Sequence, residues 1–151
     1  MIKDDELMRG DFVMFFDQHK IGHIAIVDQA MRYSCLLLYK GPEDETYETE
    51  IIVNYEDIHP IKVTEELLEK NGFKKWAWYR RHLDDTVTYG VGGGCHVEIE
   101  TIDDEKIFNL VDSCSDSGDY GYVRNYLCDA TYVHLLQHAF KLFEIEHKFV
   151  F

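Results

Sequence analysis

The residues best suited to hold a metal ion are two histidines four positions apart, His134 and His138. On a helix this spacing places both imidazoles on one face, where they can share a metal. Zinc hydrolases with such a pair place a Glu directly after the first His, but this chain has Leu135 there. No other His or Cys pair has ligand spacing. We therefore predict that His134 is solvated or hydrogen-bonded to a neighbouring segment, and we predict no metal.

Three other stretches resemble known site motifs, but each lacks a necessary part. The glycine-rich run Gly90–Gly94 is followed by a strand-like segment, whereas phosphate-binding loops lead into a helix. Cys95 and His96 are adjacent on a predicted strand and so point to opposite faces. The acidic loop 112–119 lacks the glycine of a calcium loop and has Val123 in place of its bidentate Glu. We predict no catalytic residue and no cofactor, and we lean against an enzyme.

The chain is strongly acidic, with 15 Lys and Arg against 29 Asp and Glu, a formal net charge of −14. Nucleic-acid binding relies on Lys and Arg that displace counterions from phosphates. The net negative charge therefore predicts no nucleic-acid partner. A local exception lies around Trp76, which is flanked by Lys74 and Lys75 and followed by Arg80 and Arg81. Two interpretations remain: a small basic and aromatic surface, or a strand with aromatic rings inward and cations outward. We favour the second.

Length and composition indicate one globular domain, residues 1–151, with possible sub-units at 1–60 and 61–151. Apolar residues make up 46% of the chain, which fits a packed core and not a disordered segment. No apolar run approaches a membrane span, and the acidic start does not resemble a signal peptide. We expect a cytoplasmic protein without a membrane partner and, since its four cysteines are irregularly spaced, without a disulfide. Its oligomeric state is not predictable.

The N-terminal third predicts four short strands separated by turns. A Gly-Asp turn precedes Phe12–Phe16, an alternating pattern covers 20–27, and 34–40 and 46–54 follow around an acidic loop. Such short strands with tight turns favour a small, strongly bent sheet, of which an SH3-like barrel is one form. The expected fold class for the whole chain is α+β.

A short helix is predicted at about 65–71, because Thr64 is placed to cap it and Gly72 suits the position after its end. The rest of the chain up to Cys128 predicts strands. Their connections are too short for helices, so the second half should be an antiparallel sheet. The expected strands are 76–82, 85–91, 96–102, 106–112 and 121–128.

A C-terminal amphipathic helix is predicted at about 131–143. On a helical wheel its large apolar residues form one continuous arc that includes Leu136, Phe140 and Leu142. His134, Gln137 and His138 lie on the polar remainder. This helix should cover the sheet, and a final edge strand is expected at 149–151.

Three blocks in this order resemble a family of small uncharacterised proteins of gut anaerobes and their mobile elements. The blocks are Met8-Arg9-Gly10-Asp11-Phe12-Val13, then Pro60-Ile61 with Thr64-Glu65-Glu66-Leu67-Leu68, and Tyr132-Val133-His134 with Leu136-Gln137. The resemblance implies one compact α+β fold and no particular activity. The chain departs from the family pattern at Leu135 and His138, where the family favours Gln and Asn.

These observations favour a non-catalytic accessory or protein-interaction module with a protein partner. The candidate interaction surface comprises His134, Gln137, His138, Lys74, Lys75, Trp76, Arg80 and Arg81. The alternative is a nucleic-acid-related protein, either a weak binder through the basic pairs or an acidic mimic of DNA. A metal-dependent hydrolase that uses His134 and His138 is the third hypothesis.

Overall fold

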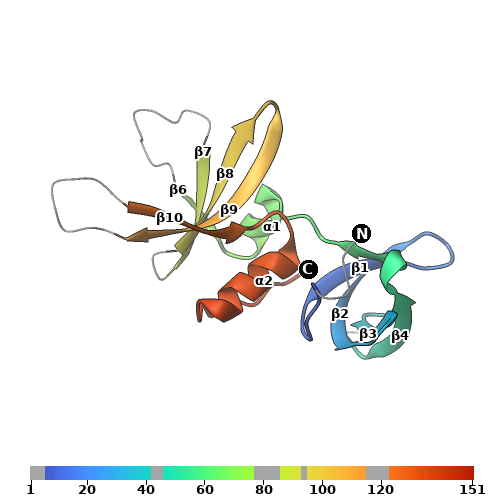
Figure 1. The fold of residues 1–151 in the computed structure, drawn as a ribbon. Helices are drawn as coiled ribbons and strands as arrows, with labels where there is room; N and C mark the ends of the chain where they lie inside the picture. Colours follow the sequence, from blue (N-terminus) through green and yellow to red (C-terminus); the bar gives the residue numbers. More distant parts are fainter. Residues whose placement is uncertain (1–5, 42–45, 77–85, 93–94, 115–122) are drawn as a thin grey trace. The chain divides into compact units, whose positions relative to one another are not determined.

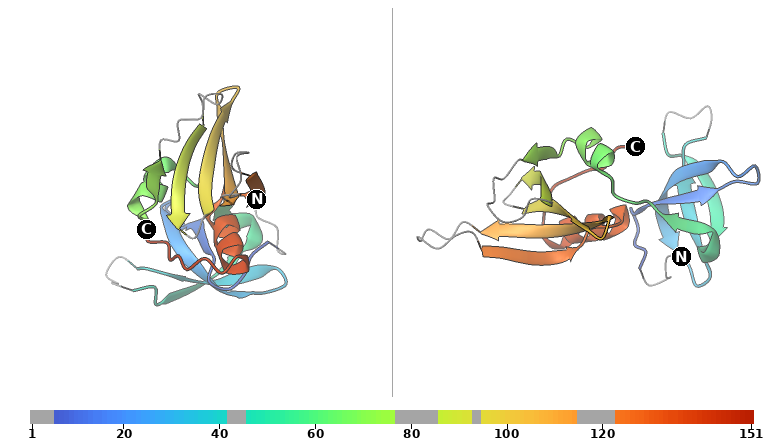
Figure 2. Two further views of the ribbon diagram at one scale, coloured as in Figure 1. Left: turned by 90° about the vertical axis from the view of Figure 1, so that its left-hand side faces the viewer. Right: turned by 90° about the horizontal axis from the view of Figure 1, so that it is seen from above.

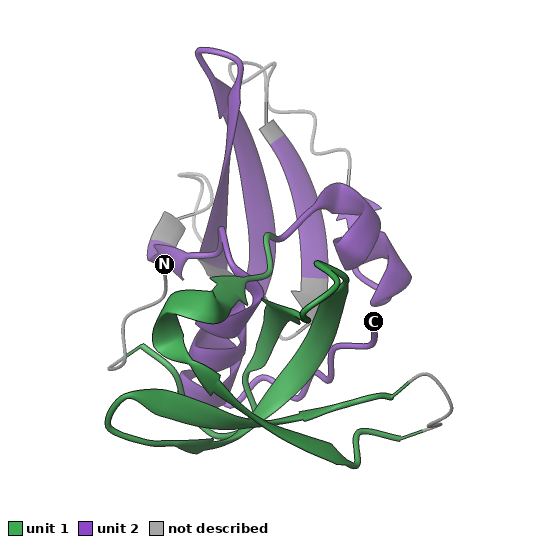
Figure 3. Cartoon of the chain, turned by 90° about the vertical axis from the view of Figure 1, so that its right-hand side faces the viewer, with its two compact units in different colours: residues 1–62 green, residues 63–151 purple. Residues whose placement is uncertain are grey.

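The computed structural model describes residues 6–41, 46–76, 86–92, 95–114 and 123–151 (Figure 1). The chain divides into two compact units, residues 1–62 and 63–151 (Figure 3). Each unit contains one five-stranded antiparallel sheet, and the second unit adds two α-helices. The expected α+β class is therefore confirmed. No helix among the described residues is long and apolar enough to cross a membrane.

The N-terminal unit holds one more strand than the sequence predicts. Its sheet has the order β4-β3-β2-β1-β5, and a 3-10 turn, η1, precedes the last strand. The pairing leaves β4 and β5 as two edges, so the sheet is not closed and does not by itself establish an SH3-like barrel. The elements are β1 (Phe12–Phe16), β2 (Gly22–Ala30), β3 (Ser34–Tyr39), β4 (Thr49–Asn54), η1 (Tyr55–Asp57) and β5 (Ile58–Pro60).

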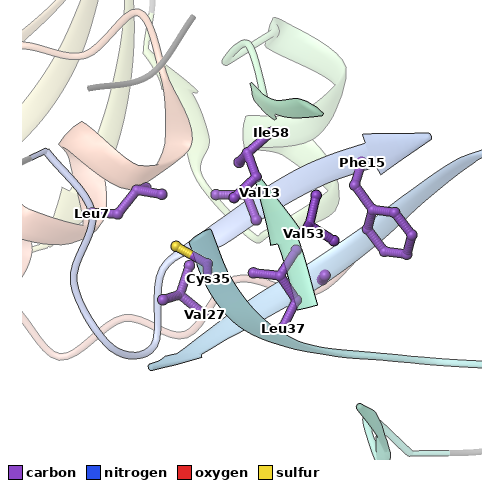
Figure 4. Close-up of a cluster of buried hydrophobic side chains, with 9 residues drawn as sticks. Leu7, Val13, Phe15, Val27, Cys35, Leu37, Val53 and Ile58 are labelled. Carbon is purple, nitrogen blue, oxygen red and sulfur yellow. The ribbon is translucent and has the colours of Figure 1, made fainter. Parts of the chain in front are cut away.

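The core of this unit comes from one face of its own sheet (Figure 4). Alternate residues on all five strands point to this inner face, and Val13, Leu37 and Ile58 there have no exposed surface. The unit has no α-helix among its described residues, so the strands bury one another. The cluster is Leu7, Val13, Phe15, Ala25, Val27, Cys35, Leu37, Val53 and Ile58.

The turn before β1 explains why the sequence has Met8-Arg9-Gly10-Asp11 there. Gly10 adopts a φ of 95°, which costs other residues strain, and its N–H donates to the Val27 carbonyl at 2.7 Å. The Asp11 side chain is buried, and its Oδ2 accepts a hydrogen bond from the Met8 N–H at 2.7 Å. This carboxylate therefore closes the turn that starts the sheet.

We expect Asp11→Ala to lower the free energy of unfolding by about 1–3 kcal/mol, because the substitution leaves a backbone donor without its acceptor. Urea unfolding measures the change. Asp28→Ala is the control, since Asp28 pairs at 2.8 Å with Arg9, whose side chain is 80% exposed. That pair should contribute less than about 1 kcal/mol. Equal losses from the two substitutions would contradict the assigned role of Asp11.

The C-terminal unit has a sheet of order β10-β9-β8-β7-β6, in which consecutive strands pair antiparallel (Figure 2). Its inner face, which includes Tyr89, Val97 and Leu110, is buried. Part of the expected strand at 76–82 lies outside the described residues. The elements are α1 (Glu65–Lys70), β6 (Lys74–Trp76), β7 (Thr86–Gly92), β8 (Cys95–Ile102), β9 (Glu105–Cys114), β10 (Val123–Asp129) and α2 (Val133–Leu142).

The helix α1 confirms the prediction of a short helix at about 65–71 and the roles predicted for Thr64 and Gly72 at its ends. Thr64 Oγ1 accepts a hydrogen bond from the Leu67 N–H at 3.1 Å, and Gly72 has a φ of 81°. Leu68 is fully buried, and Phe73 beyond the helix is 4% exposed. The short helix is thus fixed at both ends and packed through its apolar side chains.

The helix α2 differs from its prediction in length and in the face it buries. It runs over Val133–Leu142 in place of 131–143. Leu142, predicted on the apolar face, is 76% exposed, whereas His134, predicted on the polar face, is 2% exposed. The helical wheel counts only angle around the axis. Burial here also depends on position along the axis: Ala139 and Phe140 are still buried, whereas Lys141 and Leu142 at the end of the helix are exposed.

Residues after α2 form no strand, contrary to the expected edge strand at 149–151. Instead, the Asn71 side chain receives a hydrogen bond from the Val150 N–H at 2.6 Å and donates one to the Val150 carbonyl at 3.1 Å. The His147 ring lies 4.6 Å from the Phe73 ring and 5.0 Å from the Phe149 ring. These contacts fasten the C-terminal segment to the end of α1.

We expect this segment to weaken in acid, because burial lowers the pKa of His147 below its usual 6.5. The unfolded chain then binds the proton more readily than the folded one. Stability should fall as the pH drops below about 6.5 towards the folded pKa. In His147→Leu, pH-dependent chemical denaturation should show a smaller loss over this range. Lys148→Leu keeps the imidazole and should behave as wild type; a matching loss in His147→Leu would exclude this imidazole as the cause.

Candidate functional site

The outer face of the N-terminal sheet, opposite its core, carries apolar side chains on four neighbouring strands. The cross-strand register places them beside one another: Ile26 is opposite Leu38, and Leu36 is opposite Ile52. Sheets with one solvated face normally place polar residues there. This arrangement, which we call the outer apolar face, comprises Phe12, Met14, Phe16, Ile24, Ile26, Leu36, Leu38 and Ile52.

Phe16 forms one exposed end of the outer apolar face. Its ring is 5.2 Å from the His59 ring in an edge-on arrangement, and the residue is 45% exposed. Gly22 is its cross-strand partner. A Cβ at Gly22 would lie 3.2 Å from Phe16 Cε1 and 3.3 Å from Met14 Sδ. The absence of a side chain at Gly22 therefore lets the ring lie close to the sheet.

The face is covered at Phe12 and open at β4. The Phe12 ring packs edge-on against Tyr47 at 6.0 Å, and Lys40 Nζ lies 5.2 Å from the centroid of the Tyr47 ring. Burial raises the pKa of Tyr47, which keeps its hydroxyl neutral. Phe12 is consequently only 7% exposed, whereas Ile52 on β4 is 66% exposed. The outer apolar face thus offers accessible apolar surface at Phe16 and at Ile52.

The outer apolar face was not among the sequence predictions, although the sequence contains a pattern that indicates it. Strands with one buried face alternate apolar and polar residues, but Phe12–Phe16 and Leu36–Leu38 are apolar without interruption. An uninterrupted apolar run predicts a strand covered on both faces. The inner face accounts for only half of these residues, and the other half form the outer apolar face.

The described residues of the predicted interaction surface lie on two elements, α2 and β6. His134 is buried in the first turn of α2, and its ring lies 5.9 Å from Tyr132 and 6.0 Å from His138. Gln137 and His138 are half-buried. The described residues contain no group of three His, Cys, Asp or Glu arranged to hold a metal ion. Because His134 is 2% exposed, the expectation that it is solvated is wrong, whereas the alternative, a hydrogen bond to a neighbouring segment, stays a prediction.

The basic part of the predicted surface lies on β6, at the edge of the sheet opposite β10. Lys74 is exposed there. Lys75 Nζ donates to Glu65 at 3.2 Å and lies 5.7 Å from the centroid of the Tyr89 ring. Trp76 ends the strand. Arg80 and Arg81 lie outside the described residues.

A charged network joins α1 to the sheet. Glu65 in the first turn accepts from Lys106 Nζ at 2.5 Å, from the Tyr89 hydroxyl at 2.9 Å and from Lys75. Lys106, then Tyr89, contribute most to lowering the pKa of Glu65 to about 2. The Tyr89 hydroxyl is shared with Glu69 at 3.0 Å, and burial followed by these carboxylates raises its pKa. The network holds α1 against the sheet, and its carboxylates, lysines and Tyr89 hydroxyl are engaged with one another.

A second polar pair lies on the outer face of β8. His96 Nε2 and Glu98 Oε1 are 2.9 Å apart, and Glu98 is 6% exposed. Alternation along the strand places both on one face and Cys95 on the other, as predicted. Thr88 is opposite Glu98 on β7 and is also buried. An imidazole beside a carboxylate can relay a proton.

No protein-family model, curated protein or solved structure matches the chain. The resemblance based on the three sequence blocks stays a prediction. The outer apolar face stands out among the surfaces of the protein, because its apolar residues are not part of the core of the N-terminal unit.

We expect Glu65→Gln to lower the free energy of unfolding at pH 7 by about 1–2 kcal/mol, a value discounted because both lysines are half-exposed. A carboxylate with a lowered pKa stabilises the fold above pH 4.5, and this contribution disappears as the pH falls towards 2. The difference between wild type and variant should shrink over that range in denaturation curves. Glu66→Gln, at an exposed position, should change stability by less than about 0.5 kcal/mol.

Proposed function

We propose that the protein is a non-catalytic interaction module, of bacterial cytoplasmic or mobile-element origin, and that its outer apolar face binds a protein partner. One observation carries the proposal: Phe16 and Ile52 are 45% and 66% exposed within a face that is apolar across four strands. The residues between them on β2 and β3 are apolar and partly exposed, and contiguous apolar surface marks protein-interaction sites. Single exposed apolar residues would carry no such meaning.

We further propose that the N-terminal unit is an SH3-like barrel. Three features support this: the antiparallel strand order, the 3-10 turn between β4 and β5, and an inner face that the strands bury without an α-helix. A sheet that covers its own inner face has to curl. Its outer face then becomes a convex wall open to partners.

The charge of the unit indicates the chemistry of the partner. Residues 1–62 contain 6 Lys and Arg against 13 Asp and Glu, a net charge of −7. Glu50 on β4 is exposed and lies opposite Leu38 of the outer apolar face. Complementary charge favours a partner surface that combines apolar side chains with Lys or Arg. Direct nucleic-acid binding gains no support, because Lys75 is engaged by Glu65 in a chain of net charge −14.

Affinity capture from the native host tests this function. We expect a protein retained by wild type to lose about tenfold or more in affinity for Phe16→Asp and for Ile52→Asp, because each substitution places a charge in an apolar contact. Ile102→Asp in the second unit is the matched control, because Ile102 is also an exposed strand residue, at 51%. It should retain the partner. Equal retention by all variants, or a chain that captures nothing, would refute the proposal.

A further inference from the structure

The four outer strands of the two sheets differ in how their edges are protected. Exposed edges invite pairing with another chain, and proteins block them with short strands, Pro, Lys or bulges. The edge strand β5 has three residues and ends in Pro60. The edge strand β6 also has three residues and carries Lys74 and Lys75. In β10 the pairing register shifts between Tyr126 and Cys128.

The fourth outer strand, β4, has none of these features. It spans six residues, Thr49–Asn54, without Pro, Lys or Arg, and its register with β3 is continuous. No strand of the described residues pairs with its other side. Two of its central residues are β-branched, Ile51 and Ile52, which favours strand pairing. The edge of β4 is therefore a ready template for an added strand.

The side chains of β4 define what such a strand would carry. Glu50 and Ile52 point to the outer face and are exposed, whereas Val53 on the inner face is 8% exposed. Residues directly opposite across an antiparallel pair contact one another, and opposite charges there are favourable. A strand added beside β4 would thus place a cation next to Glu50 and an apolar side chain next to Ile52.

We propose that the partner binds through an extended segment that adds to β4 as a sixth strand, with Lys or Arg beside Glu50 and an apolar residue beside Ile52. The inference rests on the proposed function and specifies the partner segment. Main-chain hydrogen bonds along β4 supply affinity, and the alternating side chains supply specificity. Pairing with β4 of a second copy is disfavoured, because each chain has a net charge of −14.

The test uses the full chain and a synthetic Lys–Val peptide of about nine residues that repeats Lys-Thr-Val-Thr, a length typical of strands. Because side chains alternate between the faces of a strand, this repeat places Lys and Val in turn on one face, to match Glu50 and Ile52. Amide hydrogen exchange by NMR should slow about tenfold or more at alternate residues of β4 when the peptide is added. The same peptide with one central Val replaced by Pro has the same charge but lacks a backbone donor in the middle of the added strand. It should give no protection. Equal protection by both peptides would overturn the inference.

A charge exchange sharpens the test. Glu50→Lys should weaken binding of the Lys–Val peptide and strengthen binding of a Glu–Val peptide, whereas Glu56→Lys, at an exposed position on η1, should leave the preference unchanged. Changes confined to the region around Phe16, or no binding of any peptide, would overturn strand addition. The proposed function would still stand if Ile52→Asp loses its captured partner. Failure of capture itself would remove both proposals.

Discussion

A single sheet has two faces, and a sheet without helices can bury only one of them by curling on itself. This constraint governs the N-terminal unit, in which the described residues form no α-helix. Its strands are apolar on both faces, and the inner residues such as Val13 and Leu37 already make a complete core. The outer residues therefore contribute nothing to that core. Exposed apolar surface is unfavourable by about 25 cal/mol per Å², so the exposed Phe16 and Ile52 on the outer face favour a partner there.

Local interactions explain why much of the fold was predictable. The ends of α1 depend on Thr64 and Gly72, which act within a few residues of themselves. Apart from β5, which was not predicted, and the strand expected at 76–82, which lies mostly outside the described residues, the strands of both sheets followed from alternation and from turns rich in Gly and Asp. The structure moves most of their bounds by only a few residues. The Gly10–Asp11 turn is similar, because its strain and its closing hydrogen bond both lie within four positions.

Contacts between distant residues explain what the sequence did not reveal. Glu65 binds Lys75, Tyr89 and Lys106, which lie 10, 24 and 41 positions away, and no local pattern pairs them. The burial of His134 likewise depends on where α2 meets its surroundings and not on its angle around the helix. Uninterrupted apolar runs in the sequence indicated the outer apolar face. Whether both faces of such a strand are buried, however, depends on whether another element covers the sheet, and the sequence of the strand does not show this.

The contact between Phe16 and Gly22 has a consequence for how this protein can diverge. A Cβ at position 22 would require the Phe16 ring and the Met14 side chain to move by a few tenths of an ångström, so the residue tolerated at 22 depends on the side chain at 16. A larger residue at 22 requires a smaller or differently placed one at 16, so the pair should drift together across lineages. The shape of the outer apolar face around Phe16 thus depends on Gly22, a residue that has no side chain.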